Sequence, residues 1–385
     1  MPKTKLQRFF DNQKSSVVSV LGSLVAIVFG LLIGIILIVA FDADSAPDGI
    51  RALLITGLTS LPKLADVLYQ TAPLLLCGLA VGFAFKTGLF NIGASGQYTV
   101  GAVLALFGGL VLHLNWFFCL LLAAAGGAAW GFFPGFFKAR FNVHEVISSI
   151  MFNWIALFLV NVCVANTPAM LGQPASRTAN LAAVNSGAVL PDLGLKAVFG
   201  SNYINIGVLI AVIVAIIAHI VLNKTTFGYE MKACGKNRNA SLYAGINAKR
   251  QIILSMVLSG SMAGIAGGVY YLSGNANYVI ETHLLQMGFD GIAVALLGAN
   301  SPLGIIFSAL FIAYVYVGGN AMQPEYATET IDIILAAIIY LSAFAFILRG
   351  WIGRKLGFNQ PLKLDDPPPE TAQAATDGES EVSKA

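Results

Sequence analysis

Residues 17–41, VVSVLGSLVAIVFGLLIGIILIVAF, form a run of 25 residues that contains no charged side chain. A membrane-spanning helix needs about 20 mostly apolar residues, so this run is long enough to cross a bilayer. It is too long for the core of a signal peptide, and a small-residue cleavage pattern is missing. We therefore expect an uncleaved membrane-spanning helix here.

Similar apolar runs recur along the rest of the chain. Of its 385 residues, 57% are hydrophobic and 11% are charged, whereas a soluble domain carries about 25% charged residues. This composition excludes a soluble enzyme, a nucleic-acid-binding protein and a disordered chain. We predict an all-α integral membrane protein with about ten transmembrane helices, near residues 17–41, 67–85, 97–113, 116–137, 145–165, 204–222, 251–273, 283–298, 303–318 and 330–348.

The distribution of basic residues orients these helices. If the N-terminus lies inside, most Lys and Arg side chains fall in inside segments, and the outside segments hold only Arg51, Lys63, Arg177 and Lys196. This asymmetry obeys the positive-inside rule, so both termini are expected to be cytoplasmic. The second and seventh spans then run in opposite directions. An inverted five-plus-five helix repeat with broken helices is a common plan for transporters, and we expect it here.

The sequence predicts that the chain consists of two segments. Residues 1–358 form the expected polytopic transmembrane domain. Residues 359–385, NQPLKLDDPPPETAQAATDGESEVSKA, are rich in proline and acidic residues and have no apolar periodicity. Such a composition buries too little apolar surface to fold, so we expect a disordered cytoplasmic tail.

The sequence carries few signs of catalysis. A glycine-rich phosphate-binding loop ending in Gly-Lys-Ser/Thr is missing, and the four histidines are far apart in the sequence. The four cysteines lack metal-ligand or redox spacing. We therefore expect a transport protein that is not an enzyme, with no metal site, no bound cofactor and no ATPase site of its own.

The largest inside loop is basic and contains a helix signal. In residues 223–250, a turn at Gly235–Asn237 precedes a short helix-compatible stretch at 239–244. Asn237 or Asn239 can cap that helix, and Gly245 can end it. The loop is either a basic connector or a docking helix for a cytosolic partner.

Six motifs, in this order along residues 67–320, carry a family resemblance: GLFNIGASGQ (88–97), EVISSIMFN (145–153), GYEMKACGKN (228–237), ASLYAGI (240–246), SGSMAGIAG (259–267) and GFDGIAVALLG (288–298). Together they resemble permeases of ATP-binding-cassette (ABC) importers that serve ribose and other simple sugars, branched-chain amino acids and nucleosides. Within that group, the chain most closely resembles bacterial nucleoside permeases. ABC importers couple solute movement to ATP hydrolysis by partner subunits.

The resemblance implies that this chain forms half of a pathway across a bacterial cytoplasmic membrane. It implies three kinds of protein partner: a cytosolic ABC ATPase subunit, an external substrate-binding lipoprotein, and a second permease chain, usually a different homologue. ATP would be hydrolysed by the partner subunits. The implied ATPase-coupling residues are Gly228, Glu230, Gly235, Asn237, Ala240, Tyr243 and Gly245.

Two polar interruptions of the apolar runs are candidate pathway segments. Non-helical polar backbone at membrane depth is tolerated where it lines a cavity or is buried in protein. Gly88–Gln97 is therefore either a pathway segment or a tight cytoplasmic turn. The second interruption is Gly288–Gly298, followed by Ala299–Pro302. Within it, the carboxyl group of Asp290 either lines the pathway or anchors a structural hydrogen bond. The candidate pathway residues are Phe90, Asn91, Gln97, Asn153, Phe289 and Asp290.

These residue types favour a nucleoside as the solute. A nucleoside has an aromatic face, a hydroxylated sugar and no net charge, so it calls for aromatic and amide side chains, and base stacking contributes about 1–3 kcal/mol. A simple sugar or a branched-chain amino acid is the alternative. An ion-coupled secondary transporter is disfavoured, because only Glu145 and Asp290 are available for a carboxylate relay within the apolar runs.

Overall fold

The computed structural model describes residues 27–343. The first ten residues of the predicted span 17–41, both termini and the predicted tail 359–385 lie outside this range. Throughout the described residues, the regular elements are helices, and extended pairing is limited to isolated bridges such as Leu171 with Thr178. The predicted all-α class is confirmed.

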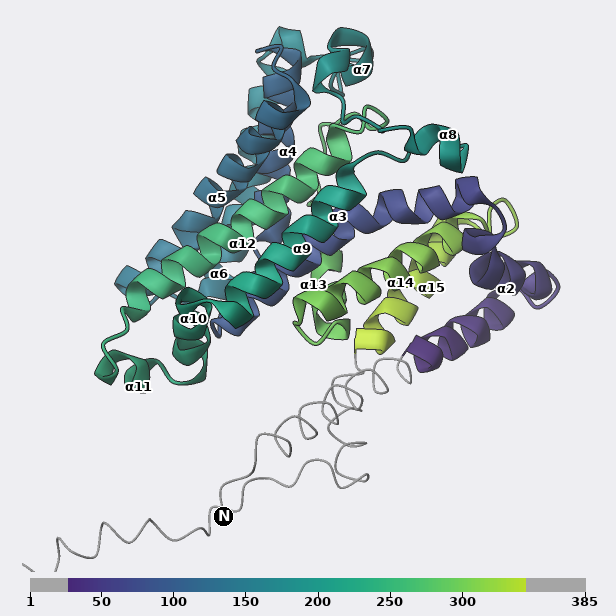
Figure 1. Ribbon diagram of the computed structural model, residues 1–385. Coiled ribbons are helices and arrows are strands. Elements are labelled where there is room, and N and C mark those ends of the chain that lie inside the picture. The colour runs from purple at the N-terminus through teal and green to yellow at the C-terminus, as the bar shows by residue number, and fades with distance from the viewer. Residues whose placement is uncertain (1–26, 344–385) are drawn as a thin grey trace, which may run out of the picture. The chain divides into compact units, whose positions relative to one another are not determined.

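The helices follow one another along the chain as an antiparallel bundle (Figure 1). Their bounds are Ile27–Phe41, α2 (Ala46–Ile55), α3 (Leu61–Lys86), α4 (Ala94–Leu110), α5 (Trp116–Phe141), α6 (Glu145–Ala165), α7 (Leu181–Val184), α8 (Leu195–Phe199), α9 (Gly207–Lys224), α10 (Thr226–Lys236), α11 (Arg238–Tyr243), α12 (Ala248–Tyr271), α13 (Met287–Leu297), α14 (Pro302–Asn320) and α15 (Thr328–Ala343).

Six of these helices are long and apolar enough to cross a membrane: α3, α5, α6, α9, α12 and α14. The helix Ile27–Phe41, α4, α13 and α15 are shorter within the described range. Each predicted apolar run overlaps one of these ten helices. The predicted interruption at Gly288–Gly298 is wrong, because Gly288–Leu297 is helical. The helix is interrupted at Gly298–Ser301 instead, where Ala299 and Asn300 have positive φ.

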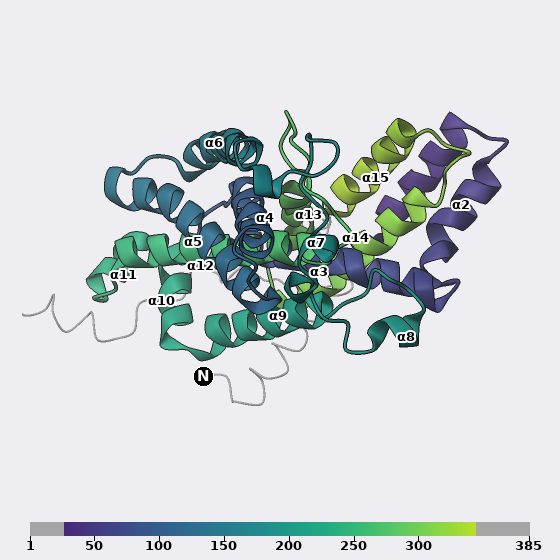
Figure 2. The same cartoon turned by 90° about the horizontal axis from the view of Figure 1, so that it is seen from above.

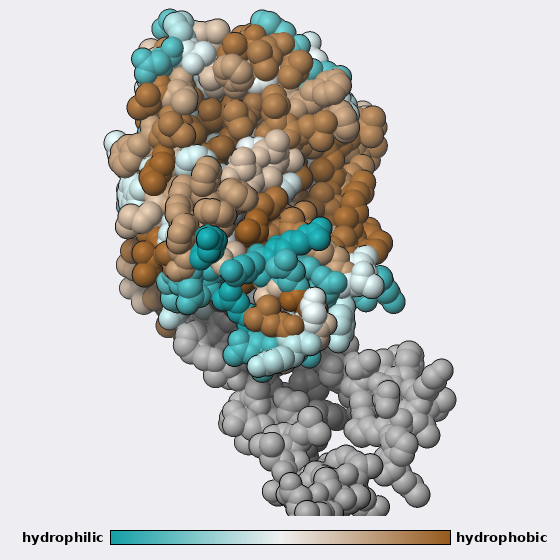
Figure 3. Space-filling model, turned by 90° about the vertical axis from the view of Figure 1, so that its left-hand side faces the viewer, coloured by the Kyte–Doolittle hydropathy of each residue, from teal (hydrophilic) through white to brown (hydrophobic). Residues whose placement is uncertain are grey.

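Helices α3 and α12 form the interior of the bundle. In their most apolar windows, 83% of α3 and 67% of α12 residues are buried, against 28% for α5 and for α9. Figure 2 shows α3 and α12 crossing the middle, with α6, α9 and α2 farther out. The outer helices expose large apolar side chains, among them Phe117, Ile147, Trp154 and Ile213. Figure 3 shows apolar surface over much of one face, with hydrophilic residues gathered toward its lower end. Such a surface suits contact with lipid.

Small residues allow α5 and α12 to pack closely. Gly127 faces the carbonyl of Gly260, and Gly131 faces the carbonyl of Met256, with no space for a Cβ atom at either position. Gly264 packs against α5 and against Gly101 of α4 in the same way. Membrane helices associate through such small-residue contacts, because lipid provides no hydrophobic force between them. This packing fixes α12 as the helix against which α4 and α5 are positioned.

Candidate solute pathway and coupling segment

A cavity with a volume of about 1060 Å³ lies between α3, α13, α14 and α15. This volume is sufficient for a drug-sized solute, since ligand pockets span roughly 300–1,000 Å³. Its described lining residues are Gln70, Gln286, Met287, Phe289, Asp290, Ile292, Ala293, Leu296, Tyr316, Asp332, Leu335, Ala336, Ile339 and Tyr340. We call it the main cavity.

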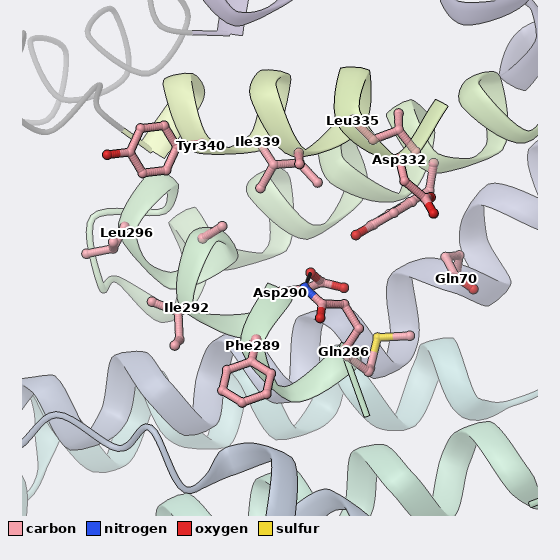
Figure 4. A pocket seen from close by; sticks show the side chains of 14 residues that line it. Gln70, Gln286, Phe289, Asp290, Ile292, Leu296, Asp332, Leu335, Ile339 and Tyr340 are labelled. Carbon is pink, nitrogen blue, oxygen red and sulfur yellow. Dashed lines mark hydrogen bonds between the residues drawn. The ribbon is translucent and has the colours of Figure 1, made fainter. Parts of the chain in front are cut away.

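The polar lining residues are concentrated in one part of the main cavity. Asp290 is 9% exposed and accepts a hydrogen bond from Gln286 Nε2 at 3.4 Å. The hydroxyl of Tyr316 also hydrogen-bonds to Asp290. The carboxylate of Asp332 lies near enough to interact electrostatically with the same tyrosine. Figure 4 shows the labelled Gln70, Gln286, Asp290 and Asp332 away from the end that holds Leu296 and Tyr340. Among the described lining residues, none is basic.

A second, smaller cavity of about 350 Å³ shares Gln70 and Tyr316 with the main cavity. Its other lining residues lie near the start of α3, at the end of α14 and in the long loop after α6: Lys63, Asp66, Tyr69, Tyr203, Val317, Asn320 and Ala321. Gln70 and Tyr316 therefore stand between the two cavities.

Two of the six predicted pathway residues, Phe289 and Asp290, line the main cavity. The other four lie elsewhere. The side chain of Phe90 is half-buried and packs on Phe85, with ring centroids 5.1 Å apart. Asn91, Gln97 and Asn153 are buried and lie among protein groups at the turn between α3 and α4. A pathway role for these four residues stays a prediction.

Asn91 sits in a buried hydrogen-bond network that joins three helices. Its Nδ2 donates to Gln97 Oε1 at 2.7 Å and to Ser259 Oγ at 2.6 Å. Gln97 Nε2 donates back to Asn91 Oδ1 at 3.2 Å, and Ser259 Oγ donates to the carbonyl of Ala80 at 2.6 Å. We call these contacts the turn network. It ties α12 to the turn where α3 ends and α4 begins.

Asn153 serves the same turn from α6. Its Oδ1 accepts from the backbone N–H of Gly96 at 2.8 Å, and its Nδ2 donates to the carbonyl of Ile92 at 3.0 Å. The turn leaves these backbone groups without helical partners, and burying such a group unpaired is costly. Asn153, which is 1% exposed, therefore supplies hydrogen-bond partners to the irregular backbone of this turn.

The basic loop folds into two short helices with their own caps. The Thr225 hydroxyl accepts from Gly228 N at 3.1 Å at the start of α10, and Asn237 Oδ1 accepts from Ala240 N at 3.0 Å at the start of α11. Gly245, with φ of +79°, follows α11. The structure therefore contains the short helix expected from the sequence, beginning one residue earlier, and Asn237 is its cap. We call α10 and α11 the coupling segment.

The coupling segment has a fixed inner side and an exposed outer side. Glu230 Oε2 accepts from Gln251 Nε2 of α12 at 2.5 Å, and Gly228 packs on the end of α9. Gly235 lies against the turn after α3, where a Cβ atom would stand 2.5 Å from the Lys86 carbonyl oxygen. The outer side exposes Tyr229 and, around α11, Ala240, Leu242 and Tyr243; the Tyr243 side chain is 94% exposed.

Sequence reasoning missed four polar residues of the main cavity: Gln70, Gln286, Tyr316 and Asp332. Asp332 is an acidic residue within the predicted span 330–348, so the expectation that only Glu145 and Asp290 are available within the apolar runs was wrong. Gln70 lay in the predicted span 67–85 between Tyr69 and Thr71, and Tyr316 lay in an apolar run. Which way either of them faces depends on how α3, α14 and α15 pack.

Within residues 27–343, no group of three or more His, Cys, Asp or Glu side chains is placed to hold a metal ion. The main cavity instead combines hydrogen-bonding side chains with apolar walls. Together with the exposed coupling segment, these features define a multi-pass membrane transport subunit.

The comparisons with known proteins narrow this class. Residues 63–343 match the family described as branched-chain amino acid transport system / permease component. The chain is 36% identical over 339 residues to the guanosine ABC transporter permease protein NupP of Bacillus subtilis, covering 86% of this chain and 95% of NupP. It is also 36% identical over 336 residues to the nucleoside ABC transporter permease protein NupB of Lactococcus lactis, covering 86% and 92%. No solved structure matches.

A more distant relative is the glucose ABC transporter permease protein TsgB13 of Haloferax volcanii, 29% identical over 338 residues, or 84% of this chain and 87% of that protein. Bacillus subtilis and Lactococcus lactis each contain a further matching permease, NupQ and NupC, at 26% and 24% identity. The chain belongs to the branched-chain amino acid transport system permease family and is an ABC transporter permease.

Proposed function

We propose that this permease moves nucleosides through the membrane by alternating access, as one subunit of an ATP-driven importer. The observation that carries the proposal is the 36% identity to NupP and NupB over 86% of the chain. The main cavity supports it, because apolar walls and uncharged amide groups beside Asp290 suit a neutral solute with an aromatic base and a sugar.

The proposed setting is the bacterial cytoplasmic membrane, with ten transmembrane helices in an inverted repeat and both termini cytoplasmic. An ABC ATPase pair would dock on the coupling segment and hydrolyse the ATP, so this chain would need no cofactor of its own. An external lipoprotein would deliver the solute. A second permease chain would complete the pathway, and the pairs NupP with NupQ and NupB with NupC support a different homologue in that place.

Movement of the coupling segment would reach the helix bundle through two contacts. Gly235 touches the backbone at Lys86 and Gly88, and Glu230 holds Gln251 on α12. The turn network joins the same turn to Ser259 on α12. A shift of α10 would therefore act on α3, α4 and α12 together, and α3 forms one wall of the main cavity.

The test is uptake of labelled uridine, adenosine and ribose into vesicles that contain the whole assembly with ATP. We expect uptake of both nucleosides, with an assembly lacking ATP as the control. Ribose uptake without nucleoside uptake would overturn the nucleoside assignment and favour the simple-sugar alternative, which the 29% identity to a glucose permease supports. Uptake of a branched-chain amino acid alone would favour the alternative that this chain is a branched-chain amino acid permease.

A further inference from the structure

The main cavity is divided by polarity in a way that the sequence motifs do not reveal. Its polar part brings together side chains from four helical regions: Gln70 of α3, Gln286 and Asp290 at the start of α13, Tyr316 of α14 and Asp332 of α15. Its other part is walled by Ile292, Leu296, Ile339 and Tyr340. Figure 4 shows this separation among the labelled side chains.

A nucleoside has the same division. Its ribose carries hydroxyl groups, which are hydrogen-bond donors as well as acceptors, and its base presents two flat apolar faces. We propose that the ribose occupies the polar part of the main cavity, where Asp332 and Asp290 accept hydrogen bonds from its hydroxyls, while the base packs against the apolar part. This inference rests on the proposed function.

The acceptor chemistry explains the fit. An ionised carboxylate only accepts hydrogen bonds and can take several, so it pairs with hydroxyl donors and not with a second anion. None of the described lining residues is basic, and a phosphate group brought to Asp290 and Asp332 would meet the like charge of both carboxylates. The cavity therefore selects ribonucleosides over nucleotides, and over nucleosides that lack the ring hydroxyls.

Asp332 is the better residue to change. Its side chain is exposed in the cavity wall, whereas Asp290 is buried and bonded to Gln286 and Tyr316. Replacing Asp332 therefore removes an acceptor without leaving a buried donor unpaired. Glu329 offers a matched control, because it is an exposed acid one turn earlier on α15 that does not line either cavity.

The experiment uses the complete assembly in vesicles and measures kcat/KM for uridine and for dideoxyuridine, which lacks both ring hydroxyls. The binding lipoprotein is the same throughout, so a change in the uridine-to-dideoxyuridine ratio between wild type and variant belongs to this chain. We expect Asp332→Leu to lower the ratio roughly tenfold, as for loss of a hydrogen bond to a charged group. Asp332→Asn retains one acceptor, so its ratio should lie between those of the wild type and Asp332→Leu. Glu329→Leu should leave the ratio unchanged.

The outcomes separate the two proposals. If the wild type transports neither compound, the proposed function fails. If it transports uridine and Asp332→Leu reduces both compounds equally, the ribose placement is wrong while the nucleoside function stands. Uptake of uridine monophosphate by the wild type at a rate similar to uridine would also overturn the placement.

Discussion

The backbone of Gly235, near the end of α10, packs directly on the backbone of Gly88 in the turn after α3. A Cβ atom on Gly235 would lie 2.8 Å from Gly88 N and 2.5 Å from the Lys86 carbonyl oxygen. Gly88 itself has φ of +74°, a conformation that glycine adopts without steric cost. The contact joins α10 to the bundle without an intervening side chain, so displacement of one backbone displaces the other.

Gly235→Ala should uncouple the transporter. The added methyl group cannot fit, so α10 must move away from the turn after α3, and motion of the docked ATPase would no longer reach the bundle. We expect ATPase activity of the assembly to persist while solute uptake falls at least tenfold. Both are measured on the same vesicles, with Lys236→Ala, an exposed neighbour, as the control. Normal uptake by Gly235→Ala would show that this contact transmits nothing.

Asn91→Ala tests whether the turn network is structural. The substitution removes the side chain that pairs with Gln97, while Ser259 keeps its bond to the Ala80 carbonyl. An unsatisfied buried polar group costs about 1–3 kcal/mol, although hydrogen bonds in membrane proteins average about 0.6 kcal/mol. We expect a lower thermal midpoint in detergent and less folded permease, with the KM of the remaining transporter unchanged. The matched control is Asn166→Ala, an exposed site bonded only to the Val162 carbonyl. A large rise in KM at normal stability would instead support solute contact by Asn91.

The sequence was sufficient to predict the helices but not their neighbours. Long apolar runs and the glycine-rich interruption at Gly88 are local features, and both appear in the structure at the expected places. One partner of Asn91 is Ser259, 168 residues away, and its identity depends on how α12 packs on α4. A polar residue in a membrane segment can face either a cavity or another buried polar group, and composition does not distinguish the two.

The same reason explains the mixed result for the pathway residues. Asp290 and Phe289 line the main cavity, but Gln70 and Tyr316 join them from α3 and α14 only because those helices pack beside α13. Asp332 was visible as an acid within an apolar run. Its position beside Tyr316 became evident only when α15 was placed against α14.

Tyr243→Ala should weaken docking of the ATPase. The side chain is 94% exposed on α11 beside the exposed Leu242, and an aromatic residue of this kind is typical of the centre of a protein interface. We expect less ATPase to co-purify with the permease, while membrane insertion is unchanged. Gly245→Val should do the same, because its φ of +79° strains a β-branched residue. Lys249→Ala, an exposed substitution four residues further along the chain from Gly245, is the control.

The thiol of Cys234 provides a reporter for the fit of α10 against the bundle. Burial raises the pKa of this thiol, and the thiolate is the form that reacts with a maleimide. In a variant whose other three cysteines are replaced by alanine, alkylation at neutral pH should therefore be slower than for a cysteine in an unstructured peptide. Because the pKa is raised, the rate should continue to increase with pH above the value at which the peptide rate levels off. Gly235→Ala should bring the rate toward that of the peptide, since it moves α10 away from the turn after α3. Equal rates for the parent variant and the peptide at every pH would contradict the burial of Cys234, and equal rates with and without Gly235→Ala would contradict the contact with Gly88.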